Sequence, residues 1–198
     1  MIDRVGSARV VRVTAIGIGA ALTASIPLTF PANGGPSELD SVVPGNTVSP
    51  GLAQVLVVPS NAPVVVALLL AACAWFALHR QWWQAVTMLV VPEVALAVNT
   101  WLLKPLWDRQ LDDHLAYPSG HTVHMVAVAT TFACLVAGLR ARIAVATLTV
   151  LALLAITPAM AELGYHHPTD VLGGAAAAAA MAIGLCWLSD ALHARRDA

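Results

Sequence analysis

Six long runs of apolar residues, separated by short polar segments, dominate the pattern along this chain. About twenty apolar residues in a helix span a bilayer, so each run predicts a membrane-spanning helix. The runs cover residues 10–30, 55 or 62–78, 85–103, 123–139, 143–163 and 171–188. Because most connections are short, neighbouring helices are expected to pack antiparallel. The pattern predicts an all-α fold, a six-transmembrane-helix bundle in a single integral membrane domain over residues 1–198.

The longest polar interruption is residues 31–60, which we expect to form an extracytoplasmic loop. Residues 31–50 are rich in Pro, Gly, Ser and Asn, which is typical of a loop, and residues 51–58 could form a short interfacial helix. The basic residues before the first apolar run could also mark a cleaved signal peptide, although that run is long for one. The alanines at 175–180 favour close helix packing.

Composition supports a membrane location and excludes several classes of function. Apolar residues make up 59% of the chain and charged residues 11%, against about 25% charged in soluble domains. The net charge of −1 gives no basis for a nucleic-acid or acidic partner, so the lipid bilayer is the expected partner. The three cysteines lie inside apolar runs, which argues against a disulfide framework or a Cys-rich metal site. The oligomeric state cannot be inferred from the sequence.

The distribution of Lys and Arg predicts the orientation of the bundle. With the N-terminus inside, the outer side carries only Lys104 and Arg109. The inner side carries Arg4, Arg9, Arg12, Arg80, Arg140, Arg142, Arg195 and Arg196. This arrangement places two polar segments, 104–122 and 164–170, together on the outer face.

The first polar segment has the features of an anion site. Ser119, Gly120 and His121 stand at the start of the fourth apolar run, where a helix N-terminus leaves free N–H groups. Gly120 permits close backbone approach, Ser119 adds a hydroxyl, and Lys104 and Arg109 add positive charge. The alternative for the two cations is that they only extend toward the interface.

The second polar segment contains a candidate nucleophile. His166 and Asp170 are four residues apart and would share one face of a helix. A carboxylate bonded to one imidazole nitrogen leaves the other nitrogen free to attack. His121 could then protonate the leaving oxygen as a general acid.

Two other polar features allow more than one interpretation. Asp108, Asp112, Asp113 and His114 could hold a divalent ion beside a phosphate, or they could form an ordinary solvated loop. Glu93 lies within the third apolar run, where it could satisfy backbone groups freed by Pro92 or face the bundle interior.

The last hundred residues resemble the type 2 phosphatidic-acid phosphatase (lipid phosphate phosphatase) superfamily, in particular its bacterial six-helix membrane members. The resemblance rests on Lys104, the Pro-Ser-Gly-His of 118–121, and His-Pro-Thr-Asp at 167–170 preceded by His166. The family motifs read K-x6-R-P, P-S-G-H and S-R-x5-H-x3-D. Two motif arginines are missing, because their positions carry Leu111 and Met160.

The resemblance implies a mechanism and assigns a role to each matching residue. His166 would form a phosphohistidine, Asp170 would orient it, and His121 would be the general acid. Lys104, Ser119 and Gly120 would bind phosphate, and Arg109 matches a second arginine of many bacterial members. The resemblance implies no metal and no cofactor.

The expected function is hydrolysis of a phosphomonoester or diphosphate of a lipid carrier, such as a polyprenyl or glycerolipid phosphate. The site would face the extracytoplasmic side of a bacterial plasma membrane. Two alternatives remain open from the sequence. One is a transferase on the same scaffold that passes the group to an alcohol other than water, and the other is a catalytically degenerate protein that binds lipid phosphate.

Overall fold

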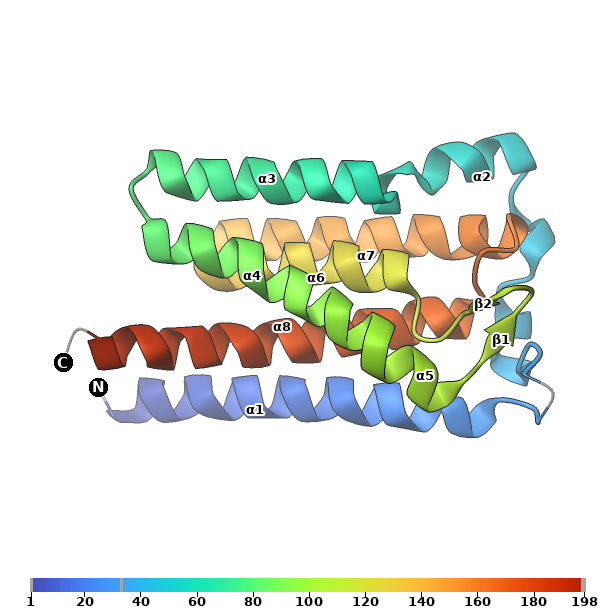
Figure 1. Ribbon diagram of the computed structural model, residues 1–198, viewed down its shortest axis with the longest axis horizontal. Coiled ribbons are helices and arrows are strands. Elements are labelled where there is room, and N and C mark those ends of the chain that lie inside the picture. The colour runs from blue at the N-terminus through green and yellow to red at the C-terminus, as the bar shows by residue number, and fades with distance from the viewer. Residues whose placement is uncertain (1, 33, 197–198) are drawn as a thin grey trace.

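A computed structural model describes residues 2–32 and 34–196 of the 198-residue chain. The described chain is a bundle of long helices with one small β-hairpin, which confirms the predicted all-α membrane fold (Figure 1). The long helices are α1 (Ile2–Ser25), α3 (Ala62–Leu78), α4 (Trp82–Val98), α6 (Gly120–Leu135), α7 (Leu139–Glu162) and α8 (Pro168–Arg196). Each of them overlaps one of the six predicted apolar runs, although α1, α4 and α6 end four or five residues before the predicted ends.

Short elements fill the connections between the long helices. They are η1 (Ile26–Thr29), η2 (Glu38–Val42), η3 (Gly45–Thr47), α2 (Pro50–Leu56), η4 (Val58–Ser60), η5 (Asn99–Leu103), α5 (Lys104–Trp107), β1 (Gln110–Leu111) and β2 (His114–Leu115). Most of them lie at one end of the bundle, together with the starts of α6 and α8, while both chain termini lie at the opposite end (Figure 1). This end therefore holds the two polar segments singled out in the sequence.

Helix α6 is the central element of the bundle. Five helical segments among the described residues are long and apolar enough to cross a membrane, whereas α6 has only 16 residues and is about 24 Å long. It contacts α3, α4, α7 and α8, and most of its residues from Thr122 to Val128 are buried. Because its neighbours shield it from lipid, α6 does not need the full length of a bilayer.

Small residues on α8 bring the two polar segments close together. At Gly173, an added Cβ would collide with the Tyr117 ring, and at Gly174 it would lie 2.9 Å from the Ser119 carbonyl oxygen. The alanine-rich stretch after them packs against α1 and α6, as small residues do in membrane helices. The Ser119 N–H donates to the Asp170 carbonyl oxygen at 3.0 Å, which joins the start of α6 to the first turn of α8.

Helix α4 continues without a break through η5, which is a turn of π-helix, into α5. Turns of this kind shift the register of a helix and are frequent at functional sites. The first residue of η5, Asn99, is fully buried and donates to the Pro118 carbonyl oxygen at 3.3 Å. The π-turn thus fixes the end of α4, and with it Lys104, against the start of α6.

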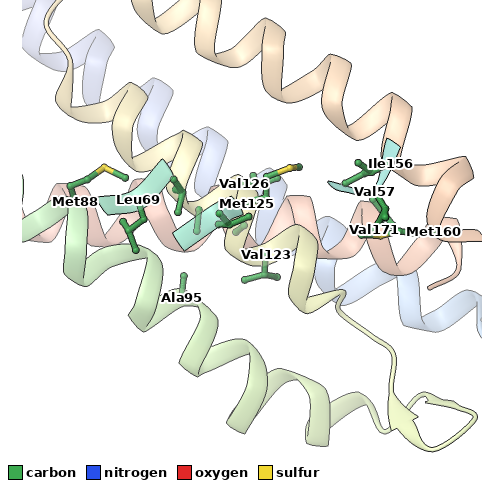
Figure 2. Close-up of a cluster of buried hydrophobic side chains, with 14 of the residues drawn as sticks. Val57, Leu69, Met88, Ala95, Val123, Met125, Val126, Ile156, Met160 and Val171 are labelled. Carbon is green, nitrogen blue, oxygen red and sulfur yellow. The ribbon is translucent and has the colours of Figure 1, made fainter. Parts of the chain in front are cut away.

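The main hydrophobic core runs along α6 and reaches the site end of the bundle. Met160 of α7 belongs to it and packs with Val57, Ile156 and Val171 (Figure 2). Met160 is fully buried, and so is its neighbour Ala159. The position where the family motif has an arginine is therefore a core position in this chain.

Candidate active site

One pocket at the hairpin end of the bundle collects most of the residues predicted from the sequence. Its volume is about 520 Å³, and Lys104, His114, Gly120, His121, His124, Tyr165 and His166 are among its lining residues. These residues come from α5, β2, the start of α6 and the α7–α8 connection, which are separated by up to about sixty positions in the sequence. The fold thus brings Lys104, Gly120, His121 and His166 around one cavity.

His166, the predicted nucleophile, is buried and electrically neutral. Burial, followed by electrostatic repulsion from Lys104, His121 and His114, lowers its pKa to about 3. A neutral imidazole has a lone pair available for attack on phosphorus. At physiological pH the side chain is therefore in the form that a nucleophile requires.

The predicted contact between His166 and Asp170 is close but is not a hydrogen bond. His166 Nδ1 lies 3.9 Å from Asp170 Oδ2, which exceeds hydrogen-bond distance. Asp170 Oδ2 instead accepts the His167 N–H at 2.8 Å, and Nδ1 has no partner among residues 2–32 and 34–196. Asp170 nevertheless lies on the Nδ1 side of the ring, which leaves Nε2 as the nitrogen for chemistry.

Arg109 lies away from the pocket, in a buried ion-pair network. It is 1% exposed and donates to Asp170 Oδ1 at 2.7 Å, to Thr169 Oγ1 at 2.7 Å and to Asp40 Oδ2 at 3.0 Å. Its guanidinium also stacks 3.9 Å from the centre of the Phe30 ring. The geometry does not support the predicted role of Arg109 as a phosphate ligand, because its guanidinium is already paired with two carboxylates.

Asp40 is the member of this network that sequence reasoning missed. Its Oδ1 accepts the Thr169 N–H at 2.9 Å, and its Oδ2 accepts the Ser37 N–H at 2.7 Å. Burial alone would raise its pKa, but the hydrogen bonds from Thr169 and Ser37 and the contact with Arg109 lower the pKa to about 2. Asp40 thus attaches the 34–43 segment to the first turn of α8. The Ser-x-x-Asp pattern at 37–40 is a capping-box signal that could have indicated it.

The start of α6 provides backbone donors to the pocket. Ser119 is fully buried and caps the helix. Its Oγ accepts hydrogen bonds from the Thr122 N–H at 3.4 Å and from the Thr122 hydroxyl at 3.1 Å. Gly120 lines the pocket, and a Cβ placed there would lie 3.9 Å from Lys104 Cε. The free N–H groups of this helix turn therefore lie next to a lysine. Ser119 shapes the turn, while its hydroxyl is already engaged with Thr122.

Three of the four imidazoles that line the pocket lie close together. The His121 ring centre lies 5.9 Å from that of His166, and the two rings are at 71° to one another. The His114 ring centre lies 5.8 Å from that of His166, with His114 Nε2 3.3 Å from the Tyr165 carbonyl oxygen. Lys104 completes the group and donates to the Leu115 carbonyl oxygen. His114 thus adds an imidazole beside His166, with its Nε2 at the Tyr165 carbonyl and its Nδ1 3.6 Å from Asp113 Oδ1.

The acidic residues next to this hairpin form its turns. Asp108 and Asp112 have φ of 44° and 51°, a left-handed conformation that aspartate tolerates better than most residues. Within the described ranges, no three His, Cys, Asp or Glu side chains are grouped so that they could hold a metal ion. The geometry thus favours the interpretation of this segment as a polar loop.

The comparison with family models matches a segment that carries Lys104, His114, Gly120, His121, His124, Tyr165 and His166 of this pocket. Residues 98–193 match the model described as the PAP2 superfamily. This match agrees with the family resemblance that the motifs of the segment indicate. Members of the PAP2 superfamily are generally phosphatases that act on phosphate esters. No curated protein and no solved structure matches the chain.

Proposed function

We propose that this protein is a membrane lipid phosphate phosphatase of the PAP2 superfamily that works through a phosphohistidine on His166. The observation that carries the proposal is the neutral, buried imidazole of His166 facing His121 and Lys104 across one pocket. The substrate would be a phosphomonoester or diphosphate of a lipid carrier, of the polyprenyl or glycerolipid type. The pocket at the end of membrane-spanning helices supports a substrate whose phosphate lies at headgroup level.

The proposed reaction has two steps. In the first, His166 Nε2 attacks phosphorus, the bond from phosphorus to the lipid oxygen breaks, and His121 donates its proton to that oxygen. In the second, a water molecule attacks the phosphorus of the phosphohistidine while His121 takes a proton from that water. The phosphorus–nitrogen bond then breaks, which releases inorganic phosphate and restores neutral His166.

Phosphate binding would rest on a donor set that differs from the family motifs. Each hydrogen bond to a charged group contributes about 1.5–3 kcal/mol, so two missing arginines would cost about 3–6 kcal/mol. Lys104, the N–H groups after Ser119, and His114 surround the position that the phosphate would occupy. We propose that His114 exchanges its contact with the Tyr165 carbonyl for one with the phosphate and so replaces one of the missing arginine contacts, because its ring lies as close to His166 as that of His121.

The orientation in the membrane is also part of the proposal. The lysine and arginine distribution favours a cytoplasmic N-terminus, which would put the pocket on the extracytoplasmic side of a bacterial plasma membrane. Water for the second step would then come from the outer compartment.

A catalytically degenerate lipid-phosphate-binding protein is the second candidate. One observation favours it: Asp170 is paired with Arg109 and makes no hydrogen bond to His166. A binding protein would retain the lipid and form no covalent intermediate, whereas a transferase would form the intermediate and pass the group to another alcohol. Analysis of the products by mass spectrometry separates these three activities.

The direct test is phosphate release from lipid phosphates by the protein purified in detergent. We expect His166→Ala to abolish release, because it removes the imidazole that would attack phosphorus. The matched control is His167→Ala, which should retain most of the activity, since the adjacent histidine does not line the pocket that holds His121 and Lys104 and instead lies against the 36–44 segment. Equal release by the wild type and His166→Ala would contradict the proposal.

A further inference from the structure

Glu93 is an ionisable residue in the middle of a membrane-spanning helix. It lies on α4 eleven residues from both Trp82 and Lys104, and its side chain is 48% exposed. The α4 residues on the same side, Val86, Leu89, Val90 and Val94, are exposed apolar residues that would face lipid. A carboxylate at such a depth is costly and is usually retained for a function. The proposed mechanism makes no use of it.

Glu93 is paired with a residue of the pocket. Its Oε1 lies 3.0 Å from Nε2 of His124, which is buried and lines the same cavity as His121 and His166. His124 follows His121 by three residues on α6, so it lies about 4.5 Å further into the bundle along the helix axis. The pair therefore stands directly below the position proposed for the phosphate.

The pocket reaches the helices that carry this pair. Helices α3 and α4 separate toward the hairpin end, and α6, which contacts both, lies between them (Figure 1). The pocket is bounded by Ser60, Asn61 and Ala62 before and at the start of α3 and by Leu96 of α4, one turn above Glu93. A lipid with its phosphate at His166 would thus have the next part of its structure beside His124 and Glu93.

We propose that Glu93 and His124 form a second polar subsite, which binds a hydrogen-bonding group of the lipid close to its phosphate. This inference rests on the proposed phosphatase function. The group would be a hydroxyl, ester carbonyl or amide, as in lipids built on a polar backbone. A lipid that is pure hydrocarbon next to its phosphate would leave the pair facing apolar atoms, and sites with buried polar groups discriminate strongly against such analogues.

The test compares kcat/KM for three probes: a diacylglycerol phosphate, a monoacylglycerol phosphate with a free hydroxyl, and a polyprenyl phosphate. The first two distinguish an ester carbonyl from a hydroxyl as the group that is bound. The variants are Glu93→Leu combined with His124→Leu, which leaves no single charge unpaired, and Glu93→Gln, which keeps a hydrogen-bonding group. The control is Thr87→Val with Ser189→Ala, which removes the 2.7 Å contact between α4 and α8 at a distance from the pocket.

We expect the wild type to prefer at least one glycerol-based probe over polyprenyl phosphate by about tenfold or more. The ratio of kcat/KM for the preferred glycerol-based probe to kcat/KM for polyprenyl phosphate should fall close to one in the double leucine variant. Glu93→Gln should give an intermediate ratio, and the control should keep the wild-type ratio. An unchanged ratio in the double variant, or an equal change in the control, would overturn the inference. If the double variant does not fold, an unchanged ratio in Glu93→Gln overturns it instead.

Failure of the proposed function gives a different result. In that case the wild type would release no more phosphate than His166→Ala from any of the three probes, and the subsite proposal would fall with it. An active wild type without a preference among the probes would contradict the subsite alone.

Discussion

Asp40→Asn is the substitution that best tests whether the 34–43 segment is held on the active site by the buried network. The carboxylate accepts hydrogen bonds from Thr169, Ser37 and Arg109, and all of these are strongest when it is ionised. Its pKa of about 2 in the folded protein, against about 3.9 in an unfolded chain, corresponds to about 2–3 kcal/mol of stability at neutral pH. Loss of one partner of a buried ion pair can raise the total cost to about 3–5 kcal/mol.

The effect should depend on pH with a definite sign. Because folding lowers the pKa of Asp40, its contribution is fully present above about pH 4 and is lost as the pH falls toward 2. The difference in free energy of unfolding between the wild type and Asp40→Asn should therefore be largest at pH 7 and decrease below pH 4. Unfolding in mixed micelles, followed by tryptophan fluorescence, measures it.

A control within the same short helix makes the result specific. Glu38 is exposed, so Glu38→Gln should change the free energy of unfolding by less than about 0.5 kcal/mol. If Asp40→Asn is as stable as the wild type at pH 7, or if its deficit stays the same down to pH 3, the buried network does not hold this segment as described.

Three further predictions address other parts of the site. Nitrogen NMR of labelled histidines should show His166 neutral from pH 8 to pH 5, because burial and the nearby cations lower its pKa to about 3; a titration near pH 6.5 would be inconsistent with this. Arg109→Ala should destabilise the fold by about 3–5 kcal/mol, because it leaves two buried carboxylates unpaired, whereas Lys104→Ala should mainly reduce kcat/KM. Thermal unfolding measures the first effect and phosphate release measures the second. Equal stability of the two variants would contradict the structural role of Arg109. Met160→Arg restores a family arginine but puts a charge into the core, so it should lower the unfolding midpoint without raising activity; a more active variant would show that position 160 reaches the phosphate.

The hydrophobic pattern predicted the helices well, because a long apolar run that crosses a membrane has few alternatives to the helical conformation. The convergence of Lys104, His121 and His166 also followed from the pattern, since the segments that carry them all had to lie at one end of the bundle. The site roles stay predictions, although the geometry places these three side chains around one pocket.

The partners of Arg109 could not be predicted from the sequence. Its counter-ions, Asp40 and Asp170, lie 69 and 61 residues away, and spacing along the chain carries no information about contacts at that range. The sequence also favoured a solvated loop for Asp112 and His114. A left-handed turn at Asp112 folds the hairpin back so that His114 reaches the pocket, and such a reversal depends on packing against the α7–α8 connection.

The most direct measurement of the central claim is to trap the covalent intermediate. The protein is mixed with a phosphorus-labelled lipid phosphate, quenched under alkaline conditions that preserve phosphohistidine, digested, and mapped by mass spectrometry. The account predicts label on His166, lost in His166→Ala and kept in His167→Ala. Steady release of phosphate with no label on His166, or with label on another residue, would contradict it.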